Sequence, residues 1–307
     1  MTQHDDYDSP WKEILSTYFE QFMTFFFPKT AQDIDWSRGY DSLDKELRQI
    51  TREAETGERL ADKLFRIWKK SGEETWVLAH VEVQAQEKRN FPCRTFVYNY
   101  RIHELYERPV VSLAVLADDN PKWRPTSYSR GLWGCTTRFR FLMVKILSYR
   151  RRLKFLRESD NPFAVVVLVH LRTMETKKND QKRFRYKIEL TKELYRRGFS
   201  RTDIINLYRF TDWIMALPEG LDDMYHKELT KFEEKEKMPY ITTAERIGSE
   251  KGIKKGIKKG TLIGKILMAQ EMIRQSVYSE KKLEGKTLTE LKHIFAEIKG
   301  KLKKFGF

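Results

Sequence analysis

Two short stretches on either side of residue 70 constrain the fold more than any other part of the chain. Residues 60–68 alternate apolar and polar side chains, and a turn-forming run follows at 71–74. The next stretch, "TWVLAHVEVQAQ" at 75–86, has the composition of a more deeply buried strand. Two such runs joined by a short loop predict a β-hairpin, so the chain must build a sheet around it.

The hairpin carries polar residues where apolar ones are expected. Glu82 and Gln84 interrupt the second strand, and Asp62 lies near the start of the first. A three-residue loop at 71–73 sets Asp62 directly opposite Glu82, with Gln84 on the same face because strand side chains alternate. A four-residue loop turns Asp62 to the other face unless a bulge restores the register.

Adjacent carboxylates in an apolar sheet repel each other and need a cation or a proton to neutralise them. Mg²⁺ prefers oxygen ligands, whereas zinc favours His or Cys. Asp62 and Glu82 are therefore candidate ligands of a divalent metal. The alternative is an ion pair with Lys63 or Arg59. His80, on the same face, is more typical of a hydrogen-bonded core residue than of a ligand.

The charge of the whole chain favours a polyanionic partner. Its 307 residues carry a formal net charge of +15, which favours nucleic acid, with an anionic membrane surface as the alternative. The N-terminus lacks the pattern of a secretion signal, and the apolar runs 22–28 and 163–171 are far shorter than the roughly 20 residues of a membrane span. Cys93 and Cys135 are expected to be reduced thiols, so we expect a cytoplasmic protein.

Helix and strand signals alternate in the first half of the chain. Besides the hairpin, they predict a helix from Ser9 to Pro28, a first strand at 45–53, a helix at 90–108, a buried strand at 110–119 and a further strand at 136–149. This order predicts an α/β protein with a mixed sheet flanked by helices.

The second half is predicted to be helical. A buried helix starts at Asn161, and helical periodicity then continues to about residue 239 with breaks at Gly198 and Pro218. Leu207, Phe210 and Trp213 form a stripe that is more typical of a core than of a base-stacking surface. We expect three regions: a core at 1–158, a helical section at 159–240 and a basic helical tail at 241–307.

The tail repeats Gly-Ile-Lys-Lys in tandem and places a glycine at every fourth position from 248 to 264. Each interior glycine costs about 1 kcal/mol relative to alanine, so this helix is expected to need a close partner backbone. Residues 249–307 hold 15 Lys and Arg against 6 Asp and Glu, a net charge of +9. Three roles remain open for the tail: a solvated arm, self-association into a homo-oligomer, and contact with DNA phosphates. The candidate lysines for phosphate contact are Lys254, Lys255, Lys258 and Lys259.

Taken in order, several blocks of the chain resemble one bacterial family. They are "WKEILSTYFEQFMTFFFP", "IDWSRGYDSLDKELRQI", "LADKLFRIWKK", "VLAHVEVQAQ", "RTFVYNYRIHELYERPVVSLAVLADD", "DNPFAVVVLVHL" and "MPYITTAERIG". From about Trp11 to Gly248 the chain resembles the recombination-promoting nucleases, whose members are often labelled transposases and belong to the PD-(D/E)XK superfamily.

The resemblance implies a restriction-endonuclease-like fold and a metal-dependent DNA endonuclease linked to recombination or mobile DNA. Asp62 matches the Asp of the motif, Glu82 its second acid, and Gln84 the position usually held by Lys. Mg²⁺, with Mn²⁺ as a substitute, is the implied cofactor. Because Gln84 cannot supply an ammonium charge, a catalytically inert DNA-binding or assembly module is the alternative.

Further candidates lie on either side of the hairpin. Glu46 is a candidate additional acid near the metal, with a plain surface role as the alternative. Arg94, Tyr98 and Arg101 follow one another at i, i+4 and i+7 on the helix after the motif. They are candidates for contact with a DNA backbone, and packing against the protein is the alternative.

Overall fold

The structure is a computed structural model that describes residues 8–44, 46–47, 61–82, 90–236, 256–257, 259–270, 278–279, 282–283, 286 and 288–304. At residues 8–9, 61–62, 78–82, 288–289 and 299–304 the description covers the backbone. The chain forms two compact units, Met1–Met238 and Pro239–Phe307.

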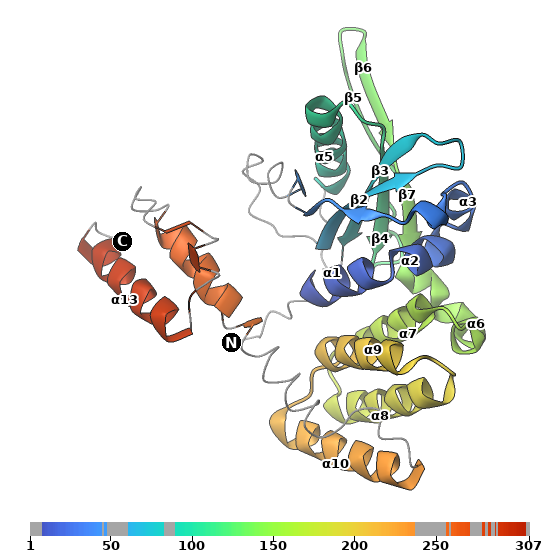
Figure 1. Cartoon of the computed structure of the whole chain (residues 1–307), viewed down its shortest axis with the longest axis vertical. Helices are drawn as coiled ribbons and strands as arrows, with labels where there is room; N and C mark the ends of the chain where they lie inside the picture. Colours follow the sequence, from blue (N-terminus) through green and yellow to red (C-terminus); the bar gives the residue numbers. More distant parts are fainter. Residues whose placement is uncertain are drawn as a thin grey trace. The chain divides into compact units, whose positions relative to one another are not determined.

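A mixed five-stranded sheet forms the centre of the first unit (Figure 1). Its strand order is β1-β2-β3-β4-β7, with antiparallel pairing from β1 to β3 and parallel pairing from β3 to β7. The strands are β1 (Asp41–Ser42), β2 (Ala61–Trp68), β3 (Glu74–Glu82), β4 (Val110–Leu116) and β7 (Leu142–Lys145). A separate hairpin pairs β5 (Ser127–Leu132) with β6 (Cys135–Arg140). The predicted α/β class with a mixed sheet is confirmed.

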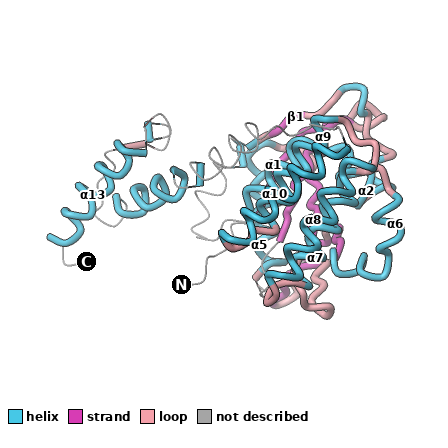
Figure 2. The backbone as a smooth tube through the Cα atoms, turned by 90° about the horizontal axis from the view of Figure 1, so that it is seen from below, coloured by secondary structure: helices cyan, strands magenta, loops and turns pink. Residues whose placement is uncertain are grey.

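Helices cover both faces of the sheet (Figure 2). Helix α5 (Phe91–Tyr106) connects β3 to β4, and its Tyr98 and Ile102 pack with Leu64 and Trp76 of the strands. On the other face, α1 (Asp8–Thr17) contacts β2, and α2 (Phe19–Phe26) places Phe19 on Phe65 with ring centroids 3.8 Å apart. Shorter turns surround them, namely α3 (Pro28–Ala31), η1 (Trp36–Arg38) and η2 (Ile146–Arg152).

The remaining helices of the first unit follow η2 along the chain. They are α6 (Leu153–Glu158), α7 (Pro162–Glu175), α8 (Asp180–Arg196), α9 (Arg201–Ile214) and α10 (Glu219–Glu236). The predicted breaks at Gly198 and Pro218 are confirmed, and so is the helix start at Asn161, whose side chain accepts a hydrogen bond from the backbone N–H of Phe163. Leu207 and Phe210 of α9 are buried, as the stripe predicted.

Three local predictions were wrong. The helix expected from Ser9 to Pro28 is broken at Tyr18, whose hydroxyl donates a hydrogen bond to Asp203 of α9 at 2.7 Å. In the described part of 45–53, Glu46 and Leu47 are helical rather than extended, because Leu43 and Leu47 both pack on Leu64 at helical spacing.

The third wrong prediction is the continuous strand at 136–149. The chain changes pairing partner at Phe141, which is buried beside Phe91, so β6 belongs to the separate hairpin and β7 to the main sheet. A 3₁₀ helix then begins at Ile146. Apolar alternation is the same for both strands, so it does not reveal a change of partner.

The second unit contains a small core of its own. Residues 259–270 are helical, and they share an apolar cluster with α13 (Leu288–Lys304) that includes Ile266, Leu291 and Ile294. A Cβ atom built on Gly256 or Gly260 meets no atom within 4 Å. Apolar packing on α13 therefore contributes to holding this helix, and the close partner backbone expected at the glycines stays a prediction. Among the helices that the structure describes, none combines the length and apolar character needed to cross a membrane.

A buried histidine joins the helical section to the sheet. The ring of His170 on α7 is 4 % exposed, and its Nε2 lies 2.8 Å from the carbonyl oxygen of Ala117, one residue beyond β4. Because a carbonyl only accepts, Nε2 carries the proton in this contact. The ring also meets Trp11 edge-on at 6.1 Å. Burial lowers the pKa of His170 to about 4 from its usual 6.5.

We expect His170 to make the fold acid-sensitive. In the unfolded chain the imidazole binds a proton near pH 6.5, whereas the folded protein resists protonation down to about pH 4. The free energy of unfolding should therefore fall by about 3 kcal/mol as the pH drops through this window. His170→Gln keeps an amide donor for Ala117 but does not titrate. Urea unfolding at several pH values should show a flatter profile for this variant, and identical profiles would contradict the assignment.

Candidate functional site

The predicted acids lie on neighbouring strands, but in a different register from the one predicted. Asp62 of β2 pairs with His80 of β3, two residues before Glu82. The loop is 70–72 rather than 71–73, because Gly72 adopts a φ of +88° at its last position, a left-handed conformation that glycine accepts readily. Asp62 therefore does not face Glu82 directly. A shift of two residues preserves the face, so the two acids are diagonal neighbours, with Cα atoms roughly 7–8 Å apart.

These positions lie on the face that α5 covers. Leu64 and Trp76 pack against α5, and strand alternation places 62, 80 and 82 on the same side of the sheet. They also lie at the end of the sheet where β3, β4 and β7 all finish, since Glu82 pairs with Leu116 and Leu116 with Lys145. The carboxyl ends of parallel strands are the usual location of ligand sites in open α/β sheets.

The first turns of α5 return to this end of the sheet. Phe91 packs with Leu116, the partner of Glu82, and the guanidinium of Arg94 lies 5.7 Å from the centroid of the Phe91 ring. Arg94 is only 6 % exposed. The positive charge of Arg94 therefore lies near Leu116, the β4 residue that pairs with Glu82, on the same face of the sheet as the two acids.

The other two predicted contacts on α5 differ from Arg94. Tyr98 is 3 % exposed and belongs to the core cluster with Leu64 and Trp76, which favours the packing alternative. Arg101, one turn further along, is half-buried. Of the three, Arg94 is the residue that the fold brings to the sheet end.

A buried ion pair completes this end of the sheet. Asp118 lies two residues beyond β4 and Lys145 ends β7. Their side chains are 1 % and 0 % exposed, and the ammonium donates to the carboxylate. The same Nζ atom lies 3.2 Å from the carbonyl oxygen of Trp123. Burial lowers the pKa of Lys145, an effect that the hydrogen bond to Asp118 opposes. The pair closes the strand ends next to the acids but is itself shut off from solvent.

Lys63, one alternative ion-pair partner for the two acids, pairs with another carboxylate. Lys63 places its Nζ 2.6 Å from Asp44, on the face opposite Asp62. Glu46 is half-buried. The hydrogen bond to Asp41 is the main cause that raises the pKa of Arg66, and the charge of Glu46 makes a smaller contribution. Arg66 lies four residues along β2 from Asp62. The effect on Arg66 therefore gives no contact between Glu46 and the end of the sheet, and the role of Glu46 as an additional acid stays a prediction.

Several predicted residues lie outside the description. Gln84, Arg59, Lys254, Lys255 and Lys258 are not among the described residues, and at Asp62, His80 and Glu82 the description covers the backbone alone. Lys259, at the start of the helix at 259–270, is half-buried.

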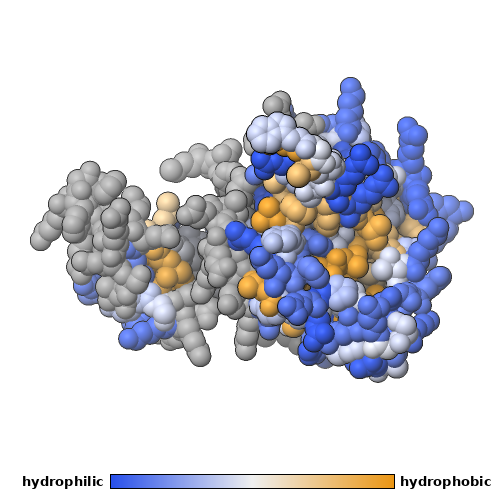
Figure 3. Space-filling model, turned by 90° about the horizontal axis from the view of Figure 1, so that it is seen from above, coloured by the Kyte–Doolittle hydropathy of each residue, from blue (hydrophilic) through white to orange (hydrophobic). Residues whose placement is uncertain are grey.

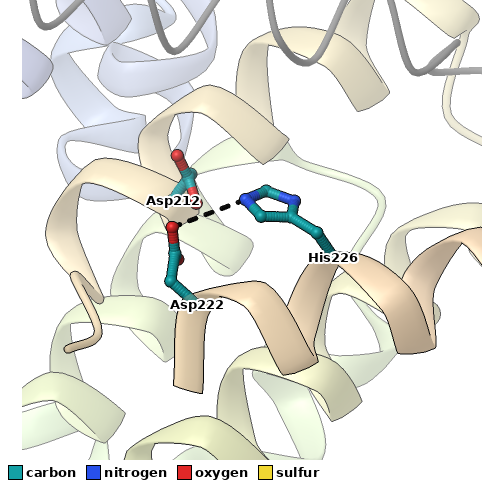
Figure 4. Close-up of side chains that lie close together, drawn as sticks. All are labelled: Asp212, Asp222 and His226. Carbon is teal, nitrogen blue, oxygen red and sulfur yellow. Dashed lines mark ion pairs between the residues drawn. The ribbon is translucent and has the colours of Figure 1, made fainter. Parts of the chain in front are cut away.

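A second acidic cluster lies in the helical section, away from the sheet. Asp212 of α9 and Asp222 and His226 of α10 bring one ligand atom each within 4.8 Å of one another (Figure 4). The Nζ atom of Lys187, which is fully buried on α8, lies 2.7 Å from Asp212 and 3.5 Å from Asp222. The Tyr225 ring adds a cation–π contact at 4.4 Å.

This second cluster therefore already contains a cation. Burial raises the pKa of Asp222, but His226 and Lys187 lower it by more, which leaves the pKa below its usual value. A divalent metal would have to displace the Lys187 ammonium and would meet its charge. We interpret the cluster as an ion-pair network that ties α8, α9 and α10 together.

The sequence analysis did not identify the two buried lysines, Lys145 and Lys187, although the sequence contains a signal for one of them. Lys145 interrupts the apolar run "FLMVKIL" in the same way that Glu82 interrupts its strand. Lys187 carries no such signal, because the stretch around it is rich in charge.

Comparisons with family models, curated proteins and solved structures find no match to this chain.

Proposed function

We propose that this protein is a metal-dependent DNA endonuclease of the PD-(D/E)XK type, with its site at the carboxyl end of the sheet. The observation that carries the proposal is the meeting of positions 62 and 82 on adjacent antiparallel strands, on one face and at one end. The order of elements agrees with the implied fold: a hairpin, a crossing helix and a parallel strand. The resemblance of the sequence blocks to recombination-promoting nucleases supports the same assignment.

The residues at this end of the sheet would have different roles according to their charge. Asp62 and Glu82 supply the oxygen donors that suit Mg²⁺ or Mn²⁺. Such an ion, held there, would lower the pKa of a bound water and stabilise charge on the phosphate. Arg94 adds a guanidinium that can pair with phosphate oxygens. Gln84 can orient water through its amide, but it cannot replace the ammonium of the usual lysine.

The charge of the chain supports DNA as the substrate. The excess of 15 positive charges attracts a polyanion irrespective of its sequence, and it agrees with a nuclease of little sequence preference. We place the activity in recombination or mobile DNA on the resemblance alone. Self-association through the basic tail and a cytoplasmic location remain predictions of the sequence.

Cleavage of supercoiled plasmid tests the proposal. The purified protein should nick or linearise the plasmid with Mg²⁺ or Mn²⁺ and leave it intact with EDTA. DNA binding that weakens steeply with salt, without cutting in either metal, would instead favour the inert DNA-binding module. Cutting that persists in EDTA would exclude the metal-dependent mechanism.

A further inference from the structure

The β5–β6 hairpin projects beyond the start of β7, at the end of the sheet opposite the carboxyl ends of its parallel strands (Figure 1). It ends in an exposed tryptophan. Leu132 pairs with Cys135, so the turn consists of Trp133 and Gly134 alone. The Trp133 side chain is 96 % exposed, and all residues from 129 to 138 are exposed. An indole in water gains nothing for folding.

The backbone at the tip is also unfavourable for tryptophan. Trp133 has a φ of +50° and Gly134 a φ of +88°, and a two-residue hairpin with both values positive follows the type I′ pattern. The first position of that turn suits Asn, Asp or Gly, whereas a bulky side chain is strained there. The sequence therefore maintains an exposed aromatic ring at a site where Asn would fit better.

The base of the hairpin is fixed to the body of the protein. Phe96 of α5 stacks on Tyr128 at 5.1 Å and meets Phe139 at 5.7 Å. The exposed tip therefore extends from an anchored base.

The charge around the tip has one sign. Residues 127–140, which form the hairpin, contain three Arg and no Asp or Glu. On the hairpin itself Arg130, Arg138 and Arg140 are exposed, and within the described part of the chain no carboxylate pairs with them. Arg138 and Arg140 lie on one face and Arg130 on the other. Figure 3 views the end from which the hairpin projects, where hydrophilic residues cover most of the surface.

We infer that this hairpin binds DNA with unpaired bases, stacking Trp133 on a base while the hairpin arginines contact the flanking phosphates. Aromatic rings stack on any base, and guanidinium groups pair with phosphate oxygens, so the combination recognises a single strand without reading its sequence. The inference rests on the proposed function for the choice of DNA as the polyanion. It adds a contact outside the metal site and a preference for open over fully paired DNA.

Fluorescence anisotropy in EDTA tests the inference without cleavage. The full chain should bind a short labelled single strand of mixed sequence more tightly than the same sequence as a duplex. Trp133→Asn should weaken single-strand binding about tenfold and leave duplex binding nearly unchanged. Its melting temperature should stay equal or rise, because Asn suits the turn. Trp133→Phe should retain most of the affinity, since the stacking ring remains.

Matched charge variants and vesicles complete the experiment. Arg138→Gln should weaken binding to the single strand more than Arg185→Gln, which removes one exposed charge from α8. Equal single-strand affinities for wild type and Trp133→Asn would overturn the inference even if the protein cuts plasmid. Co-sedimentation with vesicles of equal parts phosphatidylglycerol and phosphatidylcholine tests the membrane alternative. If Trp133→Asn loses co-sedimentation but binds DNA as the wild type does, the inference is overturned in favour of a membrane contact. If the variants change binding as expected but the protein does not cut plasmid, the result would support DNA binding by the hairpin and reject the proposed endonuclease activity.

Discussion

Asp62→Asn and Glu82→Gln should each reduce metal-dependent DNA cleavage by about 10³-fold or more. Each change removes one charged oxygen donor, and a catalytic metal contributes several kcal/mol of transition-state stabilisation at about 1.4 kcal/mol per tenfold in rate. The amides keep the shape of the acids. They also remove repulsion between diagonal neighbours, so the melting temperature without metal should stay equal or rise. Initial rates of plasmid nicking measure the effect.

The control for this prediction is an acid far from the sheet. Asp223→Asn removes one exposed carboxylate from α10 and should cut at the wild-type rate. If Asp62→Asn or Glu82→Gln retains wild-type cleavage, the site does not lie at this end of the sheet.

Lys145→Met should destabilise the first unit by about 3–5 kcal/mol. The change removes the ammonium and leaves Asp118 as an uncompensated charge, 2 % exposed at the end of β4. For a unit of this size, the loss corresponds to a fall in melting temperature of about 10 °C. Thermal unfolding followed by circular dichroism measures it.

The double variant Asp118→Asn/Lys145→Met separates charge from packing. It removes the buried carboxylate charge and keeps an oxygen that can accept the backbone N–H of Asn120, as Asp118 does at 2.9 Å. The double variant should therefore melt above Lys145→Met. If it melts equally low, lost packing of the lysine stem, rather than the isolated charge, explains the effect.

Much of the fold was predictable because burial leaves periodic patterns in the chain. The hairpin, the crossing helix α5, the strand β4 and the buried helix α7 all follow from apolar spacing and from the caps and breakers around them. The breaks near Gly198 and Pro218 follow from backbone chemistry. These signals are local, and tertiary contacts did not override them.

The wrong predictions depend on contacts between distant residues. Tyr18 breaks its helix while binding Asp203, 185 residues away in sequence. The change of strand partner at Phe141 depends on where β4 and β5 lie. The register error is different, because Gly72 was visible in the sequence. A left-handed glycine at the last position of a three-residue loop would have predicted 70–72.

The candidate site was predicted in part for the same reasons. The three-residue loop placed Asp62 and Glu82 on one face, and the two-residue shift preserved it. Arg94 came from helical spacing, but that spacing did not separate it from Tyr98, because both lie on the side of α5 that faces the sheet. The partnership of Asp118 and Lys145 joins two strand ends 27 residues apart, which only the pairing of β4 with β7 reveals.

The location of a bound metal tests the central claim most directly. Crystals of the full chain soaked in Mn²⁺ would be measured near the manganese absorption edge, and the anomalous difference map would show where the ion binds. We predict a peak between the side chains of Asp62 and Glu82 at the carboxyl end of the sheet, and its loss in Asp62→Asn. A peak at Asp212, Asp222 and His226 instead, or no peak at the sheet, would contradict the account.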